Sequence, residues 1–187
     1  MCYNPPMTIR PATIPDAQAI CSLINYYAER GRMLHRSLES VYLSLRNFLV
    51  MEDRGEIVAC VATELFWADL AEVRSLAVAP HARGKGLGTK LIRKAIVAAK
   101  KLGVHKLFAL TYEKDFFARL GFETISRERL PEKVWQACIY CPKADDCDET
   151  AMILQIMTLP GKKPLPLQRK PKRTKKRAKA THTKKKK

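Results

Sequence analysis

The 187-residue sequence predicts one α/β domain of the α+β kind, followed by a disordered, basic C-terminal tail. Short apolar segments of strand length alternate with segments whose apolar residues recur every three or four positions. Glycines and prolines separate these segments. Charge is segregated as well: residues 158–187 hold 14 of the 35 Lys and Arg and no Asp or Glu, so residues 1–157 carry a net charge of only +3.

The first half of the domain predicts a strand, two helices and a hairpin. Residues 7–11 read as the first strand, and a pair like a capping box, Thr13 and Asp16, precedes a helix that Gly31 ends. Ser37 is a suitable N-cap for a second helix. The apolar residues of that helix are Leu38, Val41, Tyr42, Leu45, Phe48 and Leu49. Strands 49–52 and 57–65 flank a turn signal at residues 53–55.

The second half predicts strands and helices around a glycine-rich loop. Residues 72–78 read as a strand that Pro80 ends. From Thr89 the apolar residues fall at helical spacing, and Gly103 closes that helix. A strand at 106–111, a short helix at 113–120 and late strands at 123–126 and 149–157 complete the predicted order.

The glycine-rich loop has the properties of an anion site. The first N–H groups of a helix lack intrahelical partners, and the helix dipole favours negative charge there. Glycines allow close backbone approach, and two basic side chains add positive charge. Neither the Walker spacing nor the dinucleotide-binding spacing is present. We therefore expect a phosphate or pyrophosphate to bind at Arg83, Gly84, Lys85, Gly86, Leu87, Gly88 and Thr89.

The spacing Arg83-x-x-Gly86-x-Gly88, after the strand residues Leu76-Ala77-Val78, resembles the acetyl-CoA signature of the GNAT superfamily of N-acetyltransferases. Residues 116–122 resemble that family's FYxxxGF segment, and the order of elements is that of the GNAT fold. The resemblance covers about residues 7–157. It implies a mixed, mostly antiparallel central sheet flanked by helices, and acetyl-CoA as co-substrate. The acetyl end would lie against Leu76, Ala77 and Val78.

Acetyl transfer to an amine requires that an ammonium substrate lose a proton, and a carboxylate near the strand is a suitable acceptor. Glu72 and Glu64 are the candidate catalytic residues; the alternative for each is an ordinary surface glutamate. In the family, the second position of FYxxxGF often holds a tyrosine that protonates the leaving thiolate. Phe117 occupies that position here and cannot donate. Tyr112 is nearby in sequence but is expected to pack, and the thiolate can leave without help.

A second resemblance concerns the acceptor amine. Residues 31–37 resemble the GxLxxRS segment of N-acetylglutamate synthases, the first enzymes of arginine biosynthesis. Residues 71–78, 108–111 and 130–149 look like the short, stand-alone bacterial form, although the Arg-x-Ser-Lys ending of the long form is missing. The resemblance implies L-glutamate as substrate, bound by Arg36, Ser37 and Arg74. This fits the chemistry, since arginine binds carboxylates bidentately.

Two other functions stay open. The chain could acetylate another amine, including a protein lysine or N-terminus. It could also be a non-catalytic, acetyl-CoA-sensing protein associated with nucleic acid. A dense basic tail attracts nucleic acid or other polyanions non-specifically, although it could equally serve only solubility. Phe117 and the tail favour this last function, whereas residues 31–37 and the cysteine region favour glutamate acetylation.

Composition limits the location and the metal chemistry. There is no apolar run of about 18 residues and no signal-peptide pattern, and six cysteines fit reduced thiols, so we expect a cytoplasmic protein that does not span a membrane. Residues 1–6 are expected to be a loose overhang, 7–157 the domain and 158–187 the tail. No metal is expected. Cys138, Cys141 and Cys147 could hold zinc, but no fourth ligand is evident and a packing role is preferred.

Overall fold

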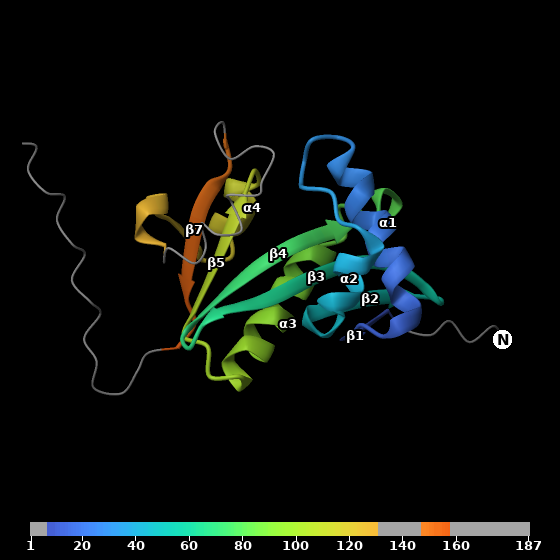
Figure 1. Cartoon of the computed structure of the whole chain (residues 1–187), viewed down its shortest axis with the longest axis horizontal. Helices are drawn as coiled ribbons and strands as arrows, with labels where there is room; N and C mark the ends of the chain where they lie inside the picture. Colours follow the sequence, from blue (N-terminus) through green and yellow to red (C-terminus); the bar gives the residue numbers. More distant parts are fainter. Residues whose placement is uncertain (1–6, 131–146, 158–187) are drawn as a thin grey trace, which may run out of the picture.

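The computed structural model describes residues 7–130 and 147–157, which form a seven-stranded sheet with helices on both faces (Figure 1). The strand order is β1-β2-β3-β4-β5-β7-β6. Among these described strands only β4 and β5 are parallel neighbours, which confirms the mixed, mostly antiparallel sheet. The strands are β1 (Thr8–Pro11), β2 (Phe48–Asp53), β3 (Glu56–Trp67), β4 (Leu70–Val78), β5 (Lys106–Thr111), β6 (Glu123–Thr124) and β7 (Thr150–Gln155).

The helices follow the predicted order, with differences at their ends. The α-helices are α1 (Ala17–Ala28), α2 (Leu38–Leu43), α3 (Leu87–Lys101) and α4 (Lys114–Ala118). Short 3₁₀ turns are η1 (Ile14–Asp16), η2 (Leu45–Asn47), η3 (Pro80–Ala82) and η4 (Arg127–Arg129). Helix α3 begins at Leu87, two residues before the predicted start, because Gly86 serves as its N-cap.

The assignment of Phe48 and Leu49 to the second helix was wrong. Helix α2 ends at Leu43, and Phe48 already pairs with Ala62 of β3. The spacing of apolar residues in this stretch suits a helix face and a strand equally. The strand is the structure observed for Phe48, and it places this side chain in the core, where it is 1% exposed. The hairpin prediction is confirmed: Arg54 and Gly55 both have positive φ, as a type I′ turn requires.

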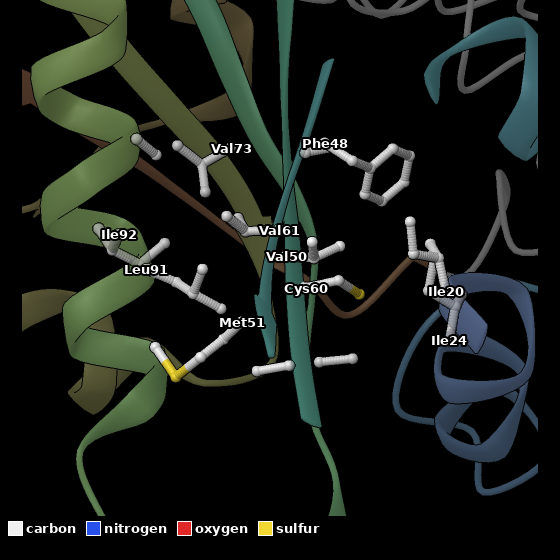
Figure 2. Packing of buried hydrophobic residues seen from close by; sticks show 14 of the residues in the cluster. Ile20, Ile24, Phe48, Val50, Met51, Cys60, Val61, Val73, Leu91 and Ile92 are labelled. Carbon is white, nitrogen blue, oxygen red and sulfur yellow. The ribbon is translucent and has the colours of Figure 1, made fainter. Parts of the chain in front are cut away.

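Strand alternation divides the core between the two faces of the sheet (Figure 2). Phe48, Val50 and Cys60 point toward Ile20 and Ile24 of α1. On the other face, Met51, Val61 and Val73 point toward Leu91 and Ile92 of α3. The sheet is therefore fixed between α1 and α3, and the central strand β4 is held by packing on both sides.

Arg10 on β1 holds the start of α1 through the buried carboxylate of Asp16. The guanidinium donates to both carboxylate oxygens, at 2.6 and 2.9 Å, and its Nε donates to Glu52 at 2.8 Å. The N–H and hydroxyl of Thr13 also donate to Asp16, at 2.7 and 2.8 Å. The hydrogen bonds from Arg10, followed by those from Thr13, hold the pKa of Asp16 well below its usual range.

We expect Asp16→Asn to lower the free energy of unfolding at pH 7 by about 3 kcal/mol, because it leaves Arg10 without its buried partner. A carboxyl whose folded pKa is depressed adds stability above its unfolded pKa, near 4, and loses it as the pH falls. Denaturant unfolding at pH 7 and pH 3 should therefore show a difference that shrinks in acid. Glu52→Gln, on the more exposed side of Arg10, is the matched control. A difference independent of pH would contradict this role of Asp16.

Several predictions concern residues outside the described ranges, namely the overhang 1–6, the tail 158–187, Cys138 and Cys141. Within the described ranges, none of the helices has both the length and the apolar character needed to cross a membrane.

Candidate active site

A cleft of about 1250 Å³ opens between the connector from α1 to α2, strand β4, the loop before α3, and helix α4. It collects most of the residues that the sequence singled out. Its lining includes Arg36, Glu72, Arg74, Leu76, Ala77, Val78, Arg83, Gly84, Gly86, Leu87, Gly88 and Thr89. Three predicted site residues, Ser37, Glu64 and Lys85, are not part of the lining.

The cleft exists because β4 and β5 separate in the middle of the sheet (Figure 1). Their parallel register covers three residue pairs and ends where Glu72 lies opposite Phe108. Beyond that point, β4 carries an extra residue relative to β3, and Ser75 has φ of +53°. This is a β-bulge, which bends a strand and increases its twist. The β5-facing edge of β4 from residue 73 onward therefore lines the cleft without a registered strand partner in the described structure.

The loop before α3 presents its backbone to one end of the cleft. Gly86 is the N-cap of α3 and has φ of +71°, a left-handed conformation that residues with a Cβ rarely adopt. The N–H groups of the first helical turn have no intrahelical partners and point toward the loop. Gly88 lies under Phe116 of α4: a Cβ at residue 88 would be 3.3 Å from the Phe116 ring. The loop can therefore accept an anion at its backbone, with Arg83 beside it.

Glu64 and Glu72 are cross-strand neighbours, and the Arg74 side chain contacts both carboxylates. The Arg74 Nη1 donates to a Glu64 carboxylate oxygen at 2.8 Å but lies 3.5 Å from the nearest oxygen of Glu72. The Glu64 side chain is 35% exposed, whereas Glu72 is buried. The sequence offered the two glutamates as equivalent candidates, and the geometry separates them. Glu72 lines the cleft, and Glu64 fixes Arg74.

Burial raises the pKa of Glu72 to about 7, because the low-dielectric surroundings disfavour the charged carboxylate. The Arg74 charge opposes this rise but does not cancel it, since its short contact goes to Glu64. For Arg74 itself, burial lowers the pKa, and the Glu72 and Glu64 carboxylates outweigh burial so that the pKa is raised. Glu72 is therefore a carboxyl that changes protonation near neutral pH beside a permanent cation.

Arg36 is partly buried at the end of the α1–α2 connector. Its backbone is fixed by Asn25, whose side-chain amide donates to the Arg36 carbonyl and accepts from the Arg36 N–H, both at 2.9 Å. Its Nη2 donates to the Ser44 hydroxyl at 3.0 Å and to the Ser40 carbonyl at 3.2 Å. The Arg36 Nη1 is buried without a hydrogen-bond partner in the described structure. Burial, followed by repulsion from Arg74, lowers the pKa of Arg36.

Ser37 and Phe117 take structural positions. The Ser37 hydroxyl accepts the Ser40 N–H at 3.1 Å, which confirms its predicted N-cap role at α2. Phe117 lies within an aromatic cluster, in edge contact with Phe116 and Phe122. It also reaches the cleft lining, as does Tyr112 directly after β5.

Sequence reasoning did not single out Arg127, Tyr27 or Glu149, all of which line the cleft. The Tyr27 hydroxyl donates to the Val78 carbonyl at the end of β4. Arg127 lies 20 residues or more before its contacts Cys147 and Glu149, so no local pattern could have revealed them. Among the described residues no group of acidic, His and Cys side chains has the arrangement of a metal site. The proposed zinc ligands Cys138 and Cys141 lie outside those residues.

Comparison with known proteins identifies relatives of this architecture. An Acetyltransferase (GNAT) domain matches residues 44–124. An uncharacterized N-acetyltransferase of Chlorobaculum tepidum is 40% identical over 145 residues, covering 78% of this chain and 94% of that protein. An amino-acid acetyltransferase of Mycobacterium tuberculosis is 35% identical over 120 residues, covering 63% of this chain and 68% of that protein.

A solved structure shares the fold as well. The N-acetylglutamate synthase from Neisseria gonorrhoeae, complexed with coenzyme A and N-acetyl-glutamate, matches with a TM-score of 0.75 and 30% sequence identity. The match covers 83% of this chain and 36% of that one, so the present chain spans little more than a third of the longer protein.

Proposed function

This chain belongs to the GNAT acetyltransferase family, and from that premise we propose that it transfers the acetyl group of acetyl-CoA to the α-amine of L-glutamate. The coarser part of this proposal, N-acetyl transfer to an amino acid, agrees with relatives that are named amino-acid acetyltransferases. The choice of glutamate depends on the cationic groups of the cleft.

Acetyl-CoA would bind along β4 with its pyrophosphate at the loop before α3. The unpaired N–H groups of the first helical turn, with Arg83, supply the positive end that a pyrophosphate requires. The pantetheine arm would then follow the open edge of β4. Backbone N–H groups near residues 76–78 would face the thioester oxygen and stabilise the charge that develops there during attack.

Glu72 would accept the proton of the attacking amine, directly or through one water. A carboxyl with a pKa of about 7 is a stronger base than an ordinary glutamate and is still largely ionised slightly above neutral pH. The neutral amine then attacks the thioester carbon, the C–N bond forms, and the C–S bond breaks to release the coenzyme A thiolate. The nitrogen loses its second proton to water or to that thiolate, which leaves the neutral amide. Phe117 cannot protonate that thiolate, and a thiol is acidic enough to leave as the anion.

The observation that carries the choice of an amino-acid substrate is the buried, unpartnered Nη1 of Arg36, a residue of the cleft lining. A buried N–H donor without an acceptor is unfavourable by about 1–3 kcal/mol. A movement of the Arg36 side chain as substrate enters would bring this donor to a carboxylate in the cleft and form a charge-assisted hydrogen bond. The neighbouring Glu72 would receive the amine of the same molecule, which is the arrangement of an α-amino acid.

A direct test is to incubate the purified protein with acetyl-CoA and each of the common amino acids while following thiol release. We expect glutamate to be among the best acceptors. Turnover only with peptide amines or polyamines would reject an amino-acid substrate and favour the alternative that a different amine is acetylated.

We expect Arg36→Ala to raise the KM for glutamate by roughly ten- to a hundred-fold and to leave the KM for acetyl-CoA nearly unchanged, since one charge-assisted pair is lost. Because Asn25 fixes the backbone of residue 36, the connector should keep its position without the guanidinium. Steady-state kinetics with each substrate varied in turn would measure both constants.

Arg46→Ala is the matched control, because Arg46 is an exposed arginine of η2 outside the cleft lining. It should leave both KM values as they are. If Arg36→Ala changed neither value, Arg36 would not bind the acceptor.

A further inference from the structure

The cleft has a second cationic wall, formed by Arg127 of η4. Arg36 precedes α2, on the side of the sheet that contains β1 to β4, whereas η4 follows β6 on the side that contains β5, β6 and β7. The gap between β4 and β5 lies between the two halves (Figure 1). Arg36 and Arg127 nevertheless line the same cleft, so they face a shared space from two halves of the sheet.

Arg127 is held in place by two contacts with residues just before β7. Its Nη2 donates to the backbone carbonyl of Glu149 at 2.6 Å and lies 2.8 Å from the Cys147 sulfur. A carbonyl oriented in this way holds the guanidinium rigidly but does not neutralise its charge. A pre-oriented, planar cation at the surface of a cleft is suited to binding a carboxylate.

We propose that Arg127 binds the side-chain carboxylate of the acceptor, while Arg36 binds its α-carboxylate. This inference rests on the proposed function and adds to it the basis of preference for a dicarboxylate. The amine must reach Glu72, and the α-carboxylate is attached to the same carbon as the amine. Arg36 is among the charges that act on Glu72, so it is close enough for the α-carboxylate. The side-chain carboxylate lies several bonds farther, toward the opposite wall.

Glu149, next to Arg127, bears on which side chains the cleft accepts. Its carboxylate acts on both Glu72 and Arg74, so negative charge also lies near the acceptor space. An acidic side chain that enters this space therefore meets the Glu149 charge as well as the cations. Arg127, bound to the main chain of Glu149, opposes the repulsion from that charge. Arg127 would therefore decide the sign of the side chain that the cleft accepts.

The test compares kcat/KM for L-glutamate and L-glutamine, which have nearly the same shape but carry a charged carboxylate and a neutral amide. For the parent protein we expect glutamate to be the better substrate. Arg127→Gln should lower kcat/KM for glutamate by roughly ten- to a hundred-fold and change it little for glutamine. Arg127→Lys, which keeps the charge, should recover part of the preference. The KM for acetyl-CoA should stay the same throughout.

Arg129→Gln is the matched control: it removes the same charge from the same turn at an exposed residue outside the cleft lining. Comparison of melting temperatures separates a binding effect from a folding effect. An equal loss for glutamate and glutamine, or no loss, would overturn the role of Arg127 even if the parent acetylates glutamate. A parent that prefers lysine would overturn it too. A parent that acetylates no amino acid would instead reject the proposed function.

Discussion

Replacing Glu72 with Gln is expected to lower kcat by about a hundred- to ten-thousand-fold, the usual contribution of a positioned general base. Glutamine has nearly the same shape but cannot accept the proton of the amine. The change also removes a buried charge, and Arg74 keeps its 2.8 Å partner Glu64, so the fold should be retained. Turnover at saturating glutamate and acetyl-CoA, with the melting temperature measured in parallel, would test both statements.

The pH dependence of kcat is a second test of Glu72 as the proton acceptor. Because the pKa of Glu72 is about 7, the base is protonated and inactive in acid and becomes active as the pH rises through neutrality. The kcat of the parent protein should therefore fall about tenfold per pH unit below pH 6 and level off above pH 8. Glu64→Gln should keep the shape of this profile but move it to lower pH, because Glu64 helps to raise the pKa of Glu72 and holds Arg74 away from it, whereas Glu72→Gln should lose the profile. A profile that is unchanged in Glu72→Gln would show that another group accepts the proton.

Gly86→Val is expected to weaken acetyl-CoA binding by about a hundredfold or more, since a side chain at the N-cap of α3 would cover the N–H groups that hold the pyrophosphate. Among the described residues, no atom beyond the adjoining chain and helix backbone lies within 4 Å of a Cβ at this position, so the obstruction would fall on the ligand. The left-handed φ of +71° adds strain for a β-branched residue. Titration calorimetry with acetyl-CoA would measure the loss of affinity.

Gly55→Val is the control that separates a loss of acetyl-CoA binding from the effect of backbone strain. Gly55 also has a positive φ and open space around its Cβ position, but it lies in the hairpin between β2 and β3, outside the cleft lining. Both variants should lose stability, and only Gly86→Val should lose acetyl-CoA. Equal affinities in the two variants would mean that the loop does not hold the coenzyme.

Most of the fold could be predicted because local signals agreed with the tertiary structure. The turn at Arg54 and Gly55, the cap at Ser37 and the end of α3 at Gly103 each carry a residue type that its backbone conformation requires. The bulge at Ser75 has no such signal, since serine seldom adopts positive φ. Yet that bulge, with the end of the β4–β5 register, is what opens the cleft.

The site was predictable to the extent that its residues are close in sequence. The glycine loop and the residues of β4 form one continuous segment, and the structure brings them to one cleft, although their roles stay predictions. The distinction between Glu64 and Glu72 depends on the position of Arg74 and on burial, which only the assembled sheet defines. Arg127 approaches the cleft through contacts with residues 20 and 22 positions later, so no local pattern could indicate it.

The β5-facing edge of β4 beyond Glu72 has no registered partner among the described strands, and this has a consequence for the protein without its coenzyme. Its backbone N–H and C=O groups can pair with another strand, and such edges are the usual starting points for strand exchange and aggregation. A pantetheine arm lying along β4 would block that edge. Binding to the folded state alone would also stabilise it, by about 2.7 kcal/mol when free ligand exceeds its Kd a hundredfold. The lifetime of the protein would then depend on the supply of acetyl-CoA, so that the coenzyme acts as a folding partner as well as an acetyl donor.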